Sequence, residues 1–156
     1  MKRTSLAGDE CPIARALDAL GDWWSLLIIR DALLGRRRFG EFQKSLGVAK
    51  YILTVRLRAL VVQGILEVAP ASDGSAYQEY LLTRKGHGIF QILVALRQWT
   101  EEFDARPQEI ATILVDRDSG RPVRKLALYA RDGRELAFAD TTLKPRPAKR
   151  RARAAG

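Results

Sequence analysis

Residues 49–63 read AKYILTVRLRALVVQ, and a glycine follows them. An apolar residue recurs every three or four positions, and the residues that share this face are Leu53, Leu57, Leu60 and Val61. The opposite face holds Tyr51, Thr54, Val55, Arg58 and Val62. The spacing predicts a helix that buries one face and presents polar and cationic side chains on the other.

A second helix is predicted directly before this one, over residues 39–46, with Gly47 as its end. Two helices joined by a tight turn that contains glycine form the helix-turn-helix pattern. After Gly64 the pattern changes to two strands, residues 65–68 and 77–82, joined by the turn-rich loop PASDGS. A hairpin directly after such a helix is a wing, so we expect a winged helix-turn-helix.

Longer helices are predicted on both sides of this unit. Residues 12–34 repeat apolar side chains at helical spacing, with Pro12 in the first turn and Gly35 after the end. Thr83 can cap a helix over residues 85–103, which is apolar on two sides. Such a helix needs two partners, its own core and a second subunit. The aromatic residues of these helices are predicted to form a dimer core or, alternatively, an effector pocket: Trp23, Trp24, Phe90, Trp99 and Phe103.

The expected fold class is therefore mainly α, of the α+β type. We expect residues 1–10 to form an N-terminal arm and residues 11–103 to form the winged helix-turn-helix with its dimerisation helices. Residues 104–143 contain strand-like runs separated by Asp-Gly and Asp-Ser-Gly turns, which predicts a small β-meander. Residues 144–156 are rich in Arg and Pro, which predicts a disordered basic tail.

The charge pattern favours a polyanionic partner. The formal net charge is +9, but residues 144–156 alone carry six Lys and Arg side chains and no acid. Within residues 36–58 there are seven Lys and Arg side chains against one acid, Glu41. This local excess predicts double-stranded DNA as the partner of the helix-turn-helix.

Catalytic and metal chemistry are not indicated. Cys11 is the single cysteine and His87 the single histidine, so neither a cysteine cage nor a histidine metal site is expected, and we expect no cofactor and no enzymatic activity. Cys11 lies just before a predicted helix, where the helix dipole can activate a thiol, although Asp9 and Glu10 oppose this. No signal-type or membrane-length apolar run is present, which favours the cytoplasm.

With these elements placed, the sequence resembles the HxlR-type transcriptional regulators, relatives of the MarR-type winged-helix proteins. The resemblance covers about residues 11–103 and rests on the order and spacing of six motifs: Cys11-Pro12, Gly21-Asp22-Trp23-Trp24, Arg38-Phe39-Gly40-Glu41-Phe42, residues 53–60 (LTVRLRAL), Gly64-Ile65-Leu66 and residues 79–86 (EYLLTRKG). It implies a homodimer that binds palindromic operators, and in some members an oxidant sensor at the position of Cys11. One departure concerns the wing, which in such proteins often carries a cation for the DNA backbone or minor groove. Here the loop from Pro70 to Ala76 carries no cation and includes Asp73.

The predicted chemistry is recognition of DNA by a repressor that binds an inverted-repeat operator. We expect Tyr51, Thr54 and Val55 to face the bases, and Arg58 either to bridge guanine O6 and N7 or to hold a phosphate. The predicted phosphate contacts are Arg36, Arg37, Arg38, Lys44, Lys50 and Arg56. The alternative is a winged helix that binds another protein and has lost specific DNA binding.

Overall fold

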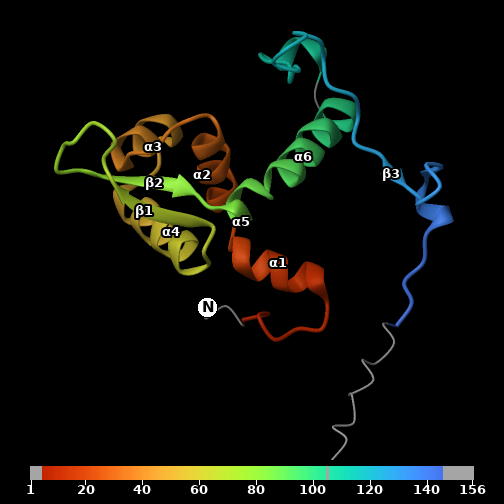
Figure 1. The fold of residues 1–156 in the computed structure, drawn as a ribbon, viewed down its shortest axis with the longest axis horizontal. Coiled ribbons are helices and arrows are strands. Elements are labelled where there is room, and N and C mark those ends of the chain that lie inside the picture. Colours follow the sequence, from red (N-terminus) through yellow and green to blue (C-terminus); the bar gives the residue numbers. More distant parts are fainter. Residues whose placement is uncertain (1–4, 105, 146–156) are drawn as a thin grey trace, which may run out of the picture. The chain divides into compact units, whose positions relative to one another are not determined.

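The computed structural model describes residues 5–104 and 106–145. The chain divides into two compact units between Ile110 and Ala111, beyond the predicted end of the winged-helix part at residue 103. The first unit contains all the long helices and the first hairpin, and the second contains two short strands (Figure 1). The predicted class, mainly α with small antiparallel strand pairs around a winged helix-turn-helix, is confirmed.

The predicted helix over residues 12–34 is two helices, α1 (Pro12–Leu20) and α2 (Trp23–Leu33). Gly21 adopts a φ of +80°, a conformation that glycine reaches without steric cost. Asp22 then caps α2, because its Oδ1 accepts a hydrogen bond from the Ser25 amide at 3.1 Å. The single-helix prediction is wrong here because the apolar spacing continues across a break that only the backbone and the cap reveal.

The helix-turn-helix consists of α3 (Phe39–Leu46) and α4 (Lys50–Val62), close to the predicted bounds. Gly47 ends α3 in the left-handed region, with a φ of +59°. Helix α2 packs against both α3 and α4. The buried core that these helices share with the hairpin is Ile28, Ile29, Phe42, Val48, Leu53, Leu57, Leu60, Ile65, Leu66 and Ile89.

The wing consists of the antiparallel strands β1 (Leu66–Pro70) and β2 (Gln78–Leu82), which pair from Leu66 opposite Leu82 to Pro70 opposite Gln78. We call the connecting residues 71–77 the wing loop. The Ala71 amide donates to the Tyr77 carbonyl at 3.0 Å and closes the loop at its base. Both strands lie within two residues of their predicted bounds.

The predicted helix over residues 85–103 is interrupted near its start. Helix α5 (Arg84–His87) is followed by a turn at residues 88–89 and by α6 (Phe90–Phe103). Thr83 caps α5 as expected, because its Oγ1 accepts a hydrogen bond from the Gly86 amide at 3.1 Å. A short 3₁₀ helix (Pro107–Glu109) then follows.

The second unit is less regular than a meander. Strands β3 (Leu128–Tyr129) and β4 (Glu135–Leu136) pair antiparallel, and Val115 bridges to Pro122. A 3₁₀ helix (Phe138–Asp140) follows. Most of the tail predicted at residues 144–156 lies outside the described residues. Within the described ranges, no helix is long and apolar enough to cross a membrane.

Candidate nucleic-acid interface

Helix α4 has the two faces that its sequence predicts. Leu53, Leu57 and Leu60 are fully buried, whereas Tyr51 is 78% exposed and Arg58 is also exposed. Val55 is exposed and Thr54 is half-buried beside it. The Thr54 hydroxyl donates to the Lys50 carbonyl at 2.9 Å, which leaves its methyl group and an oxygen lone pair for a ligand. The structure thus brings the four predicted base-facing residues to the solvent side of one helix.

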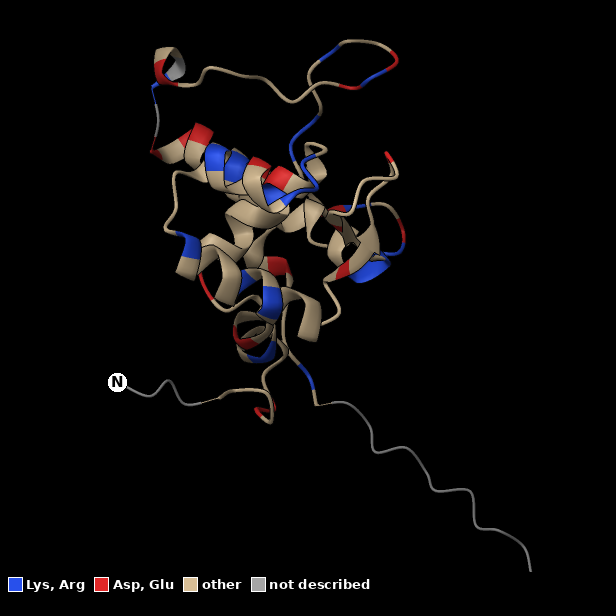
Figure 2. Cartoon of the chain, turned by 90° about the vertical axis from the view of Figure 1, so that its left-hand side faces the viewer, with Lys and Arg blue, Asp and Glu red and all other residues tan. Residues whose placement is uncertain are grey.

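Three of the seven predicted DNA-binding cations are available on this face or beside it. Lys44 lies in the last turn of α3, Lys50 begins α4 and Arg58 lies further along α4. All three are exposed, and none forms an ion pair within the part of the chain that the structure describes. Elsewhere along the ribbon, Lys and Arg residues are interspersed with Asp and Glu residues (Figure 2).

The other four predicted cations are already engaged with acids. Arg56 pairs with Asp22, the cap of α2. Arg36 lies 3.6 Å from Oδ1 of Asp31, a fully buried carboxylate that also receives two hydrogen bonds from Arg30. A phosphate contact from Arg36 or Arg56 stays a prediction, and each would require its ion pair to open.

Glu41 organises the start of α3, a role that the sequence reasoning missed when it counted this residue only as an acid. Its Oε2 accepts hydrogen bonds from the backbone amides of Arg37 at 2.7 Å and Arg38 at 2.9 Å. These two bonds hold the pKa of Glu41 below its ordinary value. Glu41 therefore fixes the backbone of the arginine cluster, and its position three residues after Arg38 was the available signal.

Arg37 and Arg38 extend their side chains to the wing. Arg37 lies 3.7 Å from Glu79 Oε2, and Arg38 lies 2.5 Å from Asp73 Oδ2 and 3.5 Å from Glu79 Oε1. The guanidinium carbon of Arg38 also lies 5.8 Å from the centre of the Tyr77 ring. The wing loop, which has no cation of its own, therefore receives one from the start of α3.

The five aromatic residues do not gather in one pocket. Trp23 is 72% exposed, while Trp24 packs against the core and contacts the Trp23 ring edge-on with centroids 6.0 Å apart. Trp99 and Phe103 form a second exposed pair, with centroids 6.1 Å apart, and Phe90 is exposed. Of the five, Trp23 alone lines the open groove of about 640 Å³ between α2 and α6.

Cys11 and His87 belong to parts of the chain other than α3, α4 and the wing. Cys11 precedes α1 and is exposed, and its amide donates to Asp9 Oδ1 at 2.8 Å. His87 is exposed, and its Nδ1 lies 3.0 Å from the Thr83 carbonyl oxygen. Among the residues that the structure describes, no group of three or more His, Cys, Asp or Glu side chains could hold a metal ion.

Known proteins resemble this chain in sequence and fold. A family model described as an HxlR-like helix-turn-helix matches residues 19–108. The HTH-type transcriptional regulator Rv3095 of Mycobacterium tuberculosis, itself uncharacterised, is 34% identical over 135 residues, which are 86% of this chain and 85% of that protein.

Two solved structures are similar over most of the chain. PA1607, described as a candidate transcription factor, is 53% identical with a TM-score of 0.85, and the match covers 90% of this chain and 99% of that one. PA1374 of Pseudomonas aeruginosa, described in the same way, is 44% identical with a TM-score of 0.63, covering 88% and 94% of the two chains. The chain therefore belongs to the HxlR-like helix-turn-helix family of transcriptional regulators.

Proposed function

We propose that this protein is a homodimeric repressor that binds an inverted-repeat DNA operator through α4. The observation that carries the proposal is the division of α4 into a buried leucine face and an exposed face with Tyr51, Val55 and Arg58. An exposed helix of this kind fits the major groove of B-DNA and presents side chains to the base edges. Family membership supports DNA as the ligand over a protein partner.

The residues divide by the contacts they would make. Arg58 reads guanine or holds a phosphate, Tyr51 and Thr54 contact base edges, and Val55 packs on a thymine methyl group. Lys44 and Lys50 hold phosphates and position the helix without reading sequence. Arg36, Arg37 and Arg38 lie at the start of α3 and would reach the same backbone only where their ion pairs with Asp31, Glu79 and Asp73 open.

A second copy of the chain would cover the exposed apolar side chains of α6. Of this helix only Val94 is buried. Its large apolar side chains that remain exposed are Phe90, Ile92, Leu96, Trp99 and Phe103. Exposed apolar residues in such number on one helix mark an interaction surface, so we assign these aromatic residues to the dimer rather than to an effector pocket. Two reading helices about 34–36 Å apart would then face successive major grooves.

The test begins with selection of bound duplexes from a random-sequence pool, followed by titration of the selected duplex. Arg58→Ala removes the contact from both half-sites at about 1–3 kcal/mol each, so it should weaken binding by about 30-fold or more. Arg131→Ala in the second unit removes the same charge from an exposed position and should leave the affinity nearly unchanged.

Sedimentation equilibrium of the same samples should show a dimer. Equal affinity of the parent and Arg58→Ala would refute the assignment of the reading face. A protein that enriches no duplex and shows no salt-dependent DNA binding would instead support a protein-binding winged helix.

A further inference from the structure

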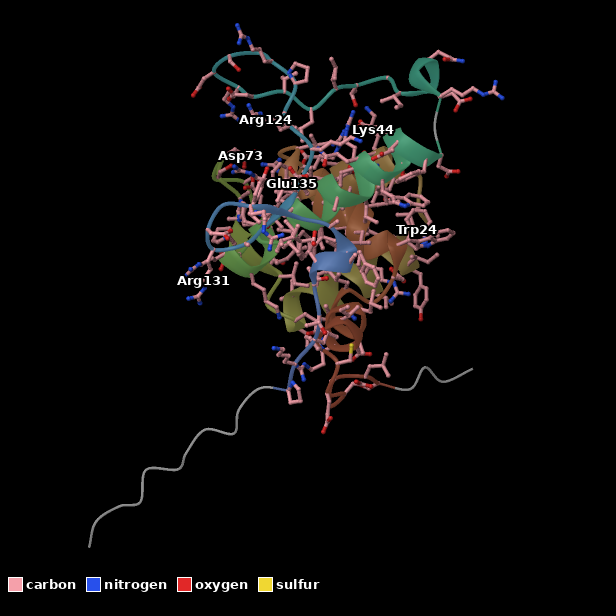
Figure 3. The ribbon with its side chains drawn as sticks, turned by 90° about the vertical axis from the view of Figure 1, so that its right-hand side faces the viewer. Trp24, Lys44, Asp73, Arg124, Arg131 and Glu135 are labelled. Atoms are coloured by element: carbon pink, nitrogen blue, oxygen red, sulfur yellow. The ribbon has the colours of Figure 1, made fainter. Side chains whose placement is uncertain are left out.

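The wing loop brings a carboxylate to the place where winged-helix proteins meet DNA backbone. Asp73 lies on this loop between β1 and β2, where Figure 3 labels it, and its side chain is 52% exposed. The Ser75 amide donates to Asp73 Oδ1 at 3.0 Å, so one carboxylate oxygen fixes the turn. The other oxygen, Oδ2, lies 2.5 Å from Arg38.

Arg38 is held from three sides but keeps a route to solvent. Asp73, Glu79 and the Tyr77 ring surround its guanidinium group, and its side chain is still 33% exposed. The hydrogen bond from Arg38, followed by those from Ser75, holds the pKa of Asp73 well below its ordinary value. At neutral pH the group facing Arg38 is therefore a full negative charge.

Glu79 supports the Arg38–Asp73 ion pair from a buried position. It is only 4% exposed, and its Oε1 accepts hydrogen bonds from the Ser72 amide at 3.3 Å and the Ser72 hydroxyl at 3.0 Å. Burial alone would raise the pKa of Glu79, but the Ser72 hydrogen bonds and the charges of Arg37 and Arg38 lower it. The Tyr80 amide also donates to the Arg37 carbonyl at 2.7 Å, so the start of α3, the wing loop and β2 are joined around this carboxylate.

We propose that Arg38 forms a phosphate subsite at the wing and that Asp73 occupies this subsite in the free protein as an internal competitor. Carboxylate and phosphate oxygens accept the same charge-assisted hydrogen bonds from a guanidinium group. A DNA phosphate that reaches the wing exchanges with Asp73, while Glu79 keeps the arginine in place. Asp73 thereby lowers the affinity of the protein for DNA backbone. This inference rests on the proposed function, because it assumes that the wing meets DNA.

The experiment is a double-mutant cycle on the full chain with a labelled duplex of about 24 bp and one fixed arbitrary sequence, long enough for two half-sites one turn apart. Asp73→Asn keeps the shape and the oxygen that accepts from Ser75 but removes the charge. At low salt it should bind the duplex about 4- to 25-fold more tightly, because each of the two partly exposed ion pairs released in the dimer contributes about 2- to 5-fold. Its affinity should also fall more steeply with salt, because no freed carboxylate takes up a cation.

The cycle separates competition for Arg38 from simple repulsion of DNA. In the Arg38→Ala background, Asp73→Asn should give a smaller gain than in the parent. An equal or larger gain there would overturn the proposal, and so would no gain in the parent. Asp118→Asn removes an exposed acid from the second unit, and a gain as large as that of Asp73→Asn would also overturn it.

Two controls keep the outcome distinct from folding and from the proposed function. Thermal melting checks each variant, and Arg38→Gln replaces Arg38→Ala in the cycle if the alanine variant is unfolded. Absence of salt-dependent duplex binding by the parent would contradict the proposed function as well. Normal binding by the parent with no response to Asp73→Asn would contradict this inference alone.

Discussion

Substitution of Gly86 by alanine should destabilise the first unit because the backbone leaves no room for a side chain. A Cβ atom built at Gly86 would lie 2.3 Å from the Ile65 carbonyl oxygen and 2.8 Å from Leu82 Cδ2. The Ile65 oxygen accepts a hydrogen bond from the Thr83 amide at 3.1 Å, so it cannot retreat without breaking that bond. Helix α5 must instead move away from the turn before β1.

The expected loss follows from two opposing effects. Forcing one methyl group into a filled site costs about 1–3 kcal/mol or more. Alanine recovers up to about 1 kcal/mol, because it suits a helix better than glycine. The net loss should therefore be roughly 1–2 kcal/mol of unfolding free energy, or a fall of several degrees in Tm.

Gly40→Ala is the matched control for this change. Gly40 lies in α3, and nothing lies within 4 Å of a Cβ built there, so this variant should be unchanged or stabilised by up to about 1 kcal/mol. Urea unfolding followed by tryptophan fluorescence measures both variants at one protein concentration, since subunit association would shift the midpoint. A Gly86→Ala protein as stable as the parent would show that α5 does not approach β1 this closely.

Two further predictions concern acid and oxidant. Because the pKa of Glu41 is lowered in the folded protein, its contribution to stability is present above about pH 4.3, the ordinary value for glutamate, and is lost as pH falls further. Below that pH, Tm should therefore fall more steeply in the parent than in Glu41→Gln. A parallel decline in the two proteins would contradict the helix-capping role. Oxidation should give a reducible dimer band on a non-reducing gel through the exposed Cys11, and Cys11→Ser should lack it; an unmodified parent after treatment with diamide would rule out the disulfide.

The helix-turn-helix was predictable because its information is local. The apolar spacing of Leu53, Leu57 and Leu60 and the glycine at residue 47 determine where α4 and α3 lie. The break before α2 was not predictable from spacing, because Leu20 and Trp24 continue the same apolar face across Gly21. In the second unit, the apolar runs predict longer strands than the two-residue strands β3 and β4 that form. The strands stay short because an isolated strand pair with little buried surface gains little stability from extension.

The contacts of the wing could not be predicted from the sequence, for a different reason. Arg38 is far from Asp73 and Glu79 along the chain, so only the fold shows that they meet. A count of charges in residues 36–58 therefore describes the composition correctly but not the charge available to DNA. The acids that engage this segment lie outside it, at Asp22, Asp31, Asp73 and Glu79.

The salt dependence of DNA binding measures how many of the cations in residues 36–58 contact DNA phosphates. If all seven cations of residues 36–58 contacted phosphate in both subunits, the slope of log K against log salt would be about −13. If only Lys44, Lys50 and Arg58 are available in each subunit, six cations of the dimer contact phosphates. Exchange of Arg38 from Asp73 to a phosphate leaves the slope unchanged, because the freed Asp73 takes up a cation. The slope should then be about −5. A variant that ends at residue 143 removes the basic tail from the measurement. A slope near −13 for that variant would mean that DNA opens all four ion-paired arginines, and the intramolecular pairs would then be weaker than the structure suggests.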